Sequence, residues 1–295
     1  MNLIHNELKN LYKKDINIIN YLKENEDLRT DEMIEISYDL QAGTYTKNIL
    51  SNKDLENYYN DYTKELSEEI KSLCSFSSIL EAGVGEATTL ANLLDKFNNI
   101  KAYGFDISFS RLLYAKKYLD IKKHKNINLC TGNLYDIPFL DNSIDIVYTS
   151  HTIEPNGGGE IKILKELYRV TNKYLVLLEP AYEFASEEVK ERMDHHGYCK
   201  NLKEYAEDLG YNVVKYQLFK YSANQNNPTA ILIIEKNNKN IAQLNKFACA
   251  KYKTPLVRYN NEYLYSEDSL YLYPIVKGIS MLRKENAILA TNLEL

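Results

Sequence analysis

The stretch SSILEAGVGEATTLANLL, residues 77–94, places a glycine loop between an apolar run and a segment with helical character. The apolar run ends at Glu81, and the loop that follows carries Gly83 and Gly85. Glycines directly after a strand allow the backbone to approach a ligand closely, as in loops that bind nucleotides. The stretch therefore predicts a ligand-binding loop, and the acidic residues around it bear on which ligand is bound.

Strand-like and helix-like segments alternate from residue 78 to residue 235. The strand-like segments are continuously apolar, which is typical of strands buried on both faces of a parallel sheet. The alternation predicts an α/β fold with a doubly wound, mostly parallel seven-stranded sheet of Rossmann-like type, in which the last two strands form an antiparallel pair. We expect strands within residues 77–83, 100–108, 127–133, 143–151, 173–180, 212–219 and 229–236, and helices within residues 87–97, 108–120, 158–171 and 202–211.

Different patterns flank this alternation. Residues 1–36 are polar with apolar residues at helical spacing, Gly43 is expected to break the chain, and residues 54–74 predict a helix capped by Asp54. Residues 237–245 have the composition of a linker, and the tail beyond them alternates like short β-strands. We therefore expect an N-terminal helical segment or lid, a nucleoside-binding domain and a small β-rich module, spanning residues 1–70, 71–236 and 246–295.

The composition limits the classes of protein and partner. The chain has 295 residues and 44% hydrophobic residues, so it can form a sizeable core, and its net charge of −5 argues against binding a phosphate backbone. Its four cysteines are widely spaced, its start has no secretory leader pattern, and no apolar run approaches the length of a membrane span. We expect a cytoplasmic protein that binds neither nucleic acid nor membrane, and the oligomeric state stays open.

The glycine loop and its surroundings indicate which nucleoside is bound. A dinucleotide-binding loop usually carries a third glycine, but here that position is Thr88. Glu81 and Glu86 flank the loop, and two carboxylates would repel a pyrophosphate but suit the ammonium and sulfonium groups of S-adenosylmethionine. Asp106, at the end of the next strand, can accept hydrogen bonds from both ribose hydroxyls. These features favour S-adenosylmethionine, and an NAD(P)-dependent oxidoreductase is the alternative.

Motifs in the expected order resemble those of class I S-adenosylmethionine-dependent methyltransferases over about residues 78–235. EAGVGEATTL is similar to the first motif, YGFDIS to the acidic second motif, and GNLYDIPFLDNSIDIVYTSHTIEP to the segment from the adenine contact to the catalytic strand. The family often has Asp where this chain has Asn133, whose carbonyl can accept from the adenine amino group. The resemblance implies cofactor contacts from Glu81 at the methionine end, Gly83 and Gly85 beneath it, Asp106 at the ribose, and Asn133 and Leu134 at the adenine.

His151 ends the fourth predicted strand, where the resemblance places methyl delivery. Methyl transfer requires alignment of the reacting atoms and, for a hydroxyl or a protonated nitrogen, a base. His151 is the candidate base, because an imidazole with a pKa of about 6.5 is largely neutral at cytoplasmic pH. Glu154 is the second catalytic candidate, and Asn156 lies in a glycine-rich turn that can shape the acceptor pocket. A structural polar role for His151 is the alternative.

Two further segments are candidates for binding the methyl acceptor. SYDLQAGTYTKNI, residues 37–49, contains Tyr38 and Tyr45 and can form a lid over the cofactor, with simple packing as the alternative. The polar loop at residues 222–228 is either solvated or lines the acceptor pocket with amide donors, and Asn224 is its candidate residue.

His195 and His196 suggest a metal site with Cys199, but the pattern is weak. Adjacent histidines rarely face one ion without a third or fourth ligand, and none is evident here. We therefore expect no metal, and interpret the two histidines as part of a solvated or substrate-facing loop.

The tail, CAKYKTPLVRYNNEYLYSEDSLYLYPIVKGISML at residues 249–282, resembles the small zinc-ribbon-derived domain called Trm112-like. That family carries Cys-x-x-Cys knuckles before Pro-Leu and a closing motif similar to YPIVKGISML. Here Cys249 remains, but the second knuckle position is Tyr252, and YSED occupies the region of the later cysteines. One thiol cannot form a structural zinc site, so the resemblance implies the module without its metal.

The whole chain resembles bacterial methyltransferases that carry a Trm112-like tail on the same polypeptide. RMDHHGYCKNLKEYAEDLGY and SANQNNPTA are similar to segments of that group, some members of which occur with enzymes of surface-glycan and flagellin glycosylation. The resemblance implies methyl transfer to a nitrogen or oxygen of a polar, sugar-derived small molecule, such as the acetimidoyl (amidine) group of legionaminic acid, a nonulosonic acid. A non-catalytic partner that keeps the methyltransferase fold is a further alternative.

Overall fold

The computed structural model describes residues 5–25, 30–222, 226–236 and 245–293. Its central sheet contains β1 (Ser78–Ala82), β2 (Lys101–Asp106), β3 (Asn128–Thr131), β4 (Ile144–Ser150), β5 (Thr171–Pro180), β6 (Asn212–Leu218) and β7 (Thr229–Glu235). These strands lie in the order β6-β7-β5-β4-β1-β2-β3, and β7 is antiparallel to both neighbours while the other pairs are parallel. The predicted α/β fold with seven mostly parallel strands is confirmed.

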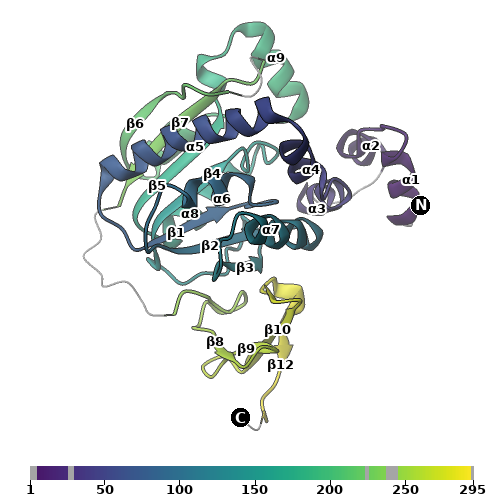
Figure 1. Cartoon of the computed structure of the whole chain (residues 1–295), viewed down its shortest axis with the longest axis vertical. Helices are drawn as coiled ribbons and strands as arrows, with labels where there is room; N and C mark the ends of the chain where they lie inside the picture. Colours follow the sequence, from purple (N-terminus) through teal and green to yellow (C-terminus); the bar gives the residue numbers. More distant parts are fainter. Residues whose placement is uncertain (1–4, 26–29, 223–225, 237–244, 294–295) are drawn as a thin grey trace.

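Helices cover both faces of this sheet (Figure 1). On one face pack α5 (Lys53–Leu73), α6 (Thr88–Leu94) and α7 (Phe109–Ile121), and on the other pack α8 (Glu160–Val170) and α10 (Leu202–Asp208). Side chains alternate along each strand, so Ile79 and Ile146 join the first layer while Leu80 and Val147 join the second. Burial on both faces explains why these strands are continuously apolar in sequence.

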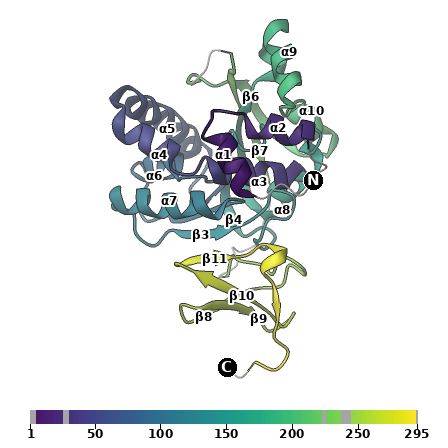
Figure 2. The same ribbon diagram turned by 90° about the vertical axis from the view of Figure 1, so that its right-hand side faces the viewer.

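The N-terminal segment forms α1 (His5–Tyr12), α2 (Ile18–Asn25), α3 (Thr30–Leu40) and α4 (Thr44–Ser51). In Figure 2, α1, α2 and α3 lie in front of the central strands. Gly43, with φ +95°, separates α3 from α4 as expected. The cap predicted for α5 is wrong, because the Asn52 side chain accepts hydrogen bonds from the backbone N–H groups of Asp54 and Leu55. In the described part of the chain, no helix is long and apolar enough to cross a membrane.

A helix lies where the sequence predicted a loop with two histidines. After a short 3₁₀ turn (Tyr182–Phe184), α9 (Glu187–His196) begins at Ser186, whose side chain caps it, and it ends at Gly197. Met193 is its buried residue, so the helix has almost no apolar stripe by which the sequence could reveal it.

The C-terminal strands are β8 (Val257–Tyr259), β9 (Tyr263–Ser266), β10 (Tyr271–Val276), β11 (Ile279–Met281) and β12 (Ile288–Leu289), with a 3₁₀ turn at Lys284–Asn286. They confirm the expected short β-strands and lie beside β3 (Figure 2). β11 pairs in parallel with β3, with Ser280 beside Cys130, so the central sheet continues into the tail as β11-β10-β9-β8. Residues 237–244 of the expected linker lie outside the described residues.

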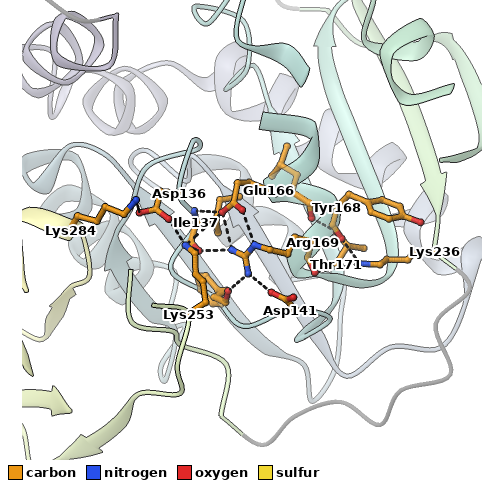
Figure 3. A network of polar contacts seen from close by, with 12 residues as sticks. Asp136, Ile137, Asp141, Glu166, Tyr168, Arg169, Thr171, Lys236, Lys253 and Lys284 are labelled. Carbon is orange, nitrogen blue, oxygen red and sulfur yellow. Dashed lines mark hydrogen bonds and ion pairs between the residues drawn. The ribbon is translucent and has the colours of Figure 1, made fainter. Parts of the chain in front are cut away.

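A network of charged side chains also joins the C-terminal segment to the sheet domain (Figure 3). Arg169 near the end of α8 donates from Nε to Oε1 of Glu166 at 2.8 Å. Lys253 pairs with Asp136 and lies 3.7 Å from Oε2 of Glu166, while Lys284 Nζ lies 3.0 Å from the other Asp136 oxygen. The C-terminal segment is therefore attached by main-chain pairing and by two lysines that converge on the loop after β3.

Candidate active site

A cavity of about 310 Å³ opens at the carboxyl ends of β1, β2, β3 and β4, where open α/β sheets bind their ligands. Tyrosines from α3, α4 and α5 cover it. The predicted residues that line the cavity are Tyr38, Tyr45, Glu81, Gly83, Gly85, Asp106, Asn133, Leu134, His151 and Asn156. Glu154, His195 and His196 are not among the lining residues, and Asn224 lies outside the described residues.

The glycine loop between β1 and α6 depends on backbone angles that favour glycine. Gly83 has a φ of +72° and Gly85 a φ of +52°. A β-carbon on Gly83 would lie 1.9 Å from Cγ2 of Thr152, and one on Gly85 would lie 2.5 Å from Nη2 of Arg111. Gly83 is therefore required by backbone conformation and by the close approach of Thr152, whereas at Gly85 the positive φ favours glycine and the end of the Arg111 side chain would have to move.

Asp106 stabilises this loop from the end of β2. Its Oδ2 accepts a hydrogen bond from the backbone N–H of Gly85 at 2.9 Å, and its Oδ1 accepts from the N–H of Ser108 at 2.9 Å. Each carboxylate oxygen can accept a second hydrogen bond. Asp106 can therefore hold the glycine loop in place and still accept from the hydroxyls of a ribose.

Glu81 is a buried carboxyl group beside the glycine loop. Its side chain is 3% exposed, and Oε2 has no hydrogen-bond partner in the part of the chain that the structure describes. Burial penalises the charged form and raises the pKa of Glu81 to about 8, although the Tyr148 hydroxyl and the backbone N–H of Leu90 favour the carboxylate and oppose this rise. A ligand with an ammonium group would supply both the missing donor and the opposite charge.

Glu86 has a different role from the one predicted. Its carboxylate accepts hydrogen bonds from the N–H of Gly43 at 2.9 Å, the N–H of Thr46 at 2.8 Å and the hydroxyl of Thr46 at 2.6 Å. It therefore caps the N-terminus of α4, where free N–H groups stabilise a negative charge. We expected this acid to help select a cationic ligand, but it attaches the covering helix to the glycine loop.

A second carboxylate, Asp39, attaches α3 to the sheet domain. Asp39 near the end of α3 accepts hydrogen bonds from the hydroxyls of Ser108 and Ser110, at 2.6 and 2.9 Å. Both serines lie at the start of α7. Glu86 of the glycine loop therefore holds α4 over the cavity, and Asp39 holds α3 there.

Glu86→Ala is expected to release α4 from the glycine loop. A hydrogen bond to a charged group contributes about 1.5–3 kcal/mol, so amide hydrogen exchange in residues 43–51 should accelerate about tenfold or more. Glu86→Gln is the matched control, because it keeps an acceptor oxygen and should show a smaller acceleration. Unchanged exchange in the alanine variant would contradict the capping role.

Arg111 of α7 lines the cavity and was not predicted from the sequence. Its guanidinium carbon lies 5.1 Å from the ring centre of Tyr38 and 4.9 Å from that of Tyr45, within the range of cation–π contacts. The two predicted lid tyrosines therefore contact a cation on the sheet domain. An arginine in the first turn of a helix is ordinary, so no sequence signal pointed to it.

Three tyrosines of α5, Tyr58, Tyr59 and Tyr62, also line the cavity and were missed. The hydroxyl of Tyr62 lies 2.9 Å from that of Ser150 at the end of β4. A signal was present, because Tyr58 and Tyr62 are four residues apart and share one face of the helix. The chain has 26 tyrosines, and their abundance concealed this pattern.

His151 and Glu154 form a pair at the end of β4. Nδ1 of His151 lies 2.7 Å from Oε2 of Glu154, and Nε2 lies 2.8 Å from the hydroxyl of Thr229. Burial opposes the charged imidazole, but the hydrogen bond and charge of Glu154 outweigh it and raise the pKa of His151. The imidazole is therefore protonated more readily than the sequence suggested, and both of its ring nitrogens have partners.

Glu154 lies behind His151 and connects it to the polar loop before β7. Its Oε1 accepts a hydrogen bond from Nδ2 of Asn227 at 3.1 Å. Burial alone would raise the pKa of Glu154, but His151, Tyr198 and Asn227 lower it. Asn227 lines the cavity, so the loop at residues 222–228 reaches the site through a residue that the sequence analysis did not name.

Asn156, by contrast, has a local contact, since its Nδ2 donates to the carbonyl oxygen of Thr152 at 3.2 Å. His195 and His196 occupy the last turn of α9, so the expected loop is a helix; they lie outside the cavity lining, and His195 is exposed, in keeping with the solvated alternative. The His196 ring stacks on Tyr198 with ring centres 5.5 Å apart. Within the described residues, no group of three His, Cys, Asp or Glu side chains is arranged to hold a metal ion.

A comparison with protein families matches residues 79–173 to a methyltransferase domain. The match includes the glycine loop, Asp106, Asn133 and the His151–Glu154 pair. Residues 79–173 form an S-adenosylmethionine-dependent methyltransferase domain. This finding decides for S-adenosylmethionine over the NAD(P) alternative. No curated protein matches this chain.

Solved structures share the fold of the methyltransferase. Magnesium protoporphyrin IX methyltransferase from Synechocystis PCC 6803 with bound S-adenosylmethionine is 15% identical, with a TM-score of 0.54 over 72% of this chain and 99% of that one. The same enzyme with bound S-adenosylhomocysteine is 15% identical, with a TM-score of 0.50 over 62% of this chain and 86% of that one. A chain from the complex between the Haloferax volcanii Trm112 methyltransferase activator and a methyltransferase is 15% identical. Its TM-score is 0.53 over 67% of this chain and 96% of that one. At such identities the likeness shows a common fold and leaves the acceptor open.

Proposed function

We propose that the cavity holds S-adenosylmethionine with its methionine part beside Glu81 and Gly83, its ribose at Gly85 and Asp106, and its adenine at Asn133 and Leu134. The observation that carries this placement is the unpartnered Oε2 of Glu81, because a buried carboxyl group beside a glycine loop needs a donor. The ammonium of the cofactor fits this need. When bound, the cofactor supplies the methyl group, activated on a sulfonium.

The methyl acceptor is proposed to enter on the side of His151. Its nitrogen or oxygen forms a bond to the methyl carbon with a lone pair while the carbon–sulfur bond breaks, and a protonated acceptor must also lose a proton to a base. We propose His151 as this base and Glu154 as the residue that orients it. Nε2 of His151 then exchanges the Thr229 hydroxyl for the acceptor.

We further propose a polar, sugar-derived acceptor, such as the acetimidoyl group of a nonulosonic (legionaminic) acid used in surface or flagellin glycosylation, methylated in the cytoplasm. Glu154 supports this proposal from behind His151, because its lowered pKa keeps a negative charge next to the cavity wall, which favours a cationic acceptor such as an amidinium. The tyrosines of α5 also line the cavity and offer ring faces to a cationic acceptor. Asn227 contributes an amide that a sugar hydroxyl can contact.

Glu154→Gln is expected to move the acid limb of the pH–rate profile to lower pH. Glu154 raises the pKa of His151, so its removal lowers that pKa. A base must be unprotonated, and wild-type kcat therefore falls as the pH drops through the raised pKa, whereas the variant retains its remaining activity to lower pH. Loss of orientation should reduce maximal kcat about tenfold or more. If the limb stays in place, His151 is not the base.

The acceptor is tested by methyl transfer from isotope-labelled cofactor to free and nucleotide-activated sugar acids, with and without an acetimidoyl group. We expect the mass increase of one methyl group only on the amidine-bearing sugars, and none with the Asp106→Ala variant. Transfer to other metabolites alone would overturn the acceptor class. Cofactor binding without transfer to any fraction of cell metabolites would favour the non-catalytic alternative.

We propose that residues 246–295 form a Trm112-like module without zinc, joined to a lid at residues 1–70 and a catalytic domain at residues 71–236. Tyr252 stands where a second knuckle cysteine is expected, and Cys249 lies in the core of the module with its Sγ 3.3 Å from the hydroxyl of the fully buried Tyr273. In the Haloferax complex Trm112 is named as a methyltransferase activator. Here the equivalent module would belong to the same polypeptide as the domain it contacts.

A further inference from the structure

Asn133 and Asp31 join the end of β3 to the first turn of α3. Nδ2 of Asn133 donates a hydrogen bond to Oδ2 of Asp31 at 3.0 Å, and Oδ1 of Asn133 accepts from the backbone N–H of Tyr135 at 2.9 Å. This orientation of the amide is the favourable one, because the reverse would place two donors, Nδ2 and the Tyr135 N–H, against each other. Asn133 therefore presents a donor towards α3.

The arrangement changes the role expected of Asn133. The 6-amino group of adenine is a hydrogen-bond donor and needs an acceptor. The carbonyl of Asn133 already accepts from the Tyr135 N–H, and its amide group faces Asp31, whose charged carboxylate is the stronger acceptor. Asp31 lines the same cavity as Ile107 and Leu134, which follow the ends of β2 and β3. A carboxylate therefore stands on the lid side of the region proposed for the base.

We propose that Asp31 accepts the hydrogen bond from the 6-amino group of adenine, with Asn133 as the residue that orients its carboxylate. This inference rests on the proposed placement of the cofactor. Each carboxylate oxygen offers two acceptor positions, so the group can keep its contact with Asn133 and also accept from the base. Where the resembled family often has an acidic residue at the end of β3, this chain has the amide of Asn133 there and the carboxylate of Asp31 on α3.

The consequence is that base recognition requires a closed lid. Asp31 lies at the start of α3 and Asp39, which binds the first turn of α7, lies near its end. Displacement of α3 would remove the acceptor from the base as well as the cover from the cavity. An adenosine ligand would therefore favour the closed position of α3 more strongly than a ligand whose base has no amino group.

Calorimetric titration of the full chain with S-adenosylhomocysteine and S-inosylhomocysteine tests the proposal, because the second compound carries a carbonyl oxygen in place of the 6-amino group. Wild type should prefer the adenosine compound. Asp31→Asn should reduce this preference about tenfold or more, since it loses the charged acceptor and can donate to the carbonyl. The exchange Asp31→Asn with Asn133→Asp returns a carboxylate to the pair and should restore the preference.

Glu35→Gln separates base recognition from attachment of the lid. Glu35 lies on the same helix, pairs with Arg283 of the C-terminal segment and does not line the cavity. Its replacement should weaken both compounds equally and leave their ratio unchanged. Asp31→Ser is the second variant should Asp31→Asn fail to fold. A wild-type ratio in the Asp31 variant overturns the proposal but not the cofactor placement, whereas failure of the wild type to bind S-adenosylhomocysteine overturns both.

Discussion

Gly83→Ala is expected to abolish cofactor binding and to destabilise the methyltransferase. The added methyl group would stand 1.9 Å from Cγ2 and 2.6 Å from Oγ1 of Thr152, on a backbone with a φ of +72°. Thr152 cannot move away without cost, because its N–H donates to buried Glu179 at 3.1 Å. Overpacking and backbone strain together should lower the free energy of unfolding by about 3 kcal/mol or more, measured by urea denaturation.

Two further variants separate steric overlap from backbone strain. Adding Thr152→Ala to Gly83→Ala removes the two closest contacts, and we expect it to recover part of the stability. Gly158→Ala has a φ of +87° but no atom within 4 Å of the added carbon, so it measures strain alone, at about 1 kcal/mol. It should bind S-adenosylhomocysteine normally. A Gly83→Ala protein as stable as Gly158→Ala would contradict the packing around Thr152.

The affinity for S-adenosylhomocysteine is expected to rise with pH, by up to about tenfold per unit below pH 8. The reason is the pKa of Glu81, which burial raises to about 8, so that the free protein must release a proton before the carboxylate pairs with the ligand ammonium. Titration in buffers of different ionisation enthalpy should count this proton. Glu81→Gln should lose the pH dependence and bind about 100-fold more weakly at pH 8.

The same pKa determines how the stability of the free protein varies with pH. The folded pKa of Glu81 lies above its ordinary value of 4.5, so between these values the folded state keeps a proton that the unfolded state has lost. The stability contributed by this group is fully present below pH 4.5 and is lost as the pH rises through 8. The Tm of Glu81→Gln should therefore fall less than that of wild type between about pH 5 and 8. Parallel curves would argue against an elevated pKa.

The sheet and its glycine loop could be predicted because each depends on local signals. β1 and β4 are buried on both faces, so their sequences are continuously apolar, and the alternation with helices gives the parallel order. Gly83 and Gly85 follow a strand directly, as a loop with positive φ angles requires. Asp106 could be placed at the cavity because the ends of neighbouring parallel strands meet at one edge of a sheet.

The contacts between distant segments could not be predicted in this way. Asp31 and Asn133 are 102 residues apart, and Glu86 contacts a helix that begins about forty residues before it. Nothing in the flanking sequence of Glu86 distinguishes a helix cap from a ligand contact. The raised pKa of His151 likewise depends on the fold, because it reflects both burial and the position of Glu154. Sequence therefore located the glycine loop well and the contacts of α3 and α4 poorly.

The parallel pairing of β11 with β3 has a consequence for aggregation. Without β11, the sheet would end at β3 and present unpaired backbone N–H and C=O groups, a template on which strands of other chains can add. Instead it continues to β8, a strand of only three residues, and short edge strands are poor templates. In the folded chain the C-terminal segment therefore shields the β3 edge of the catalytic domain from edge-to-edge association.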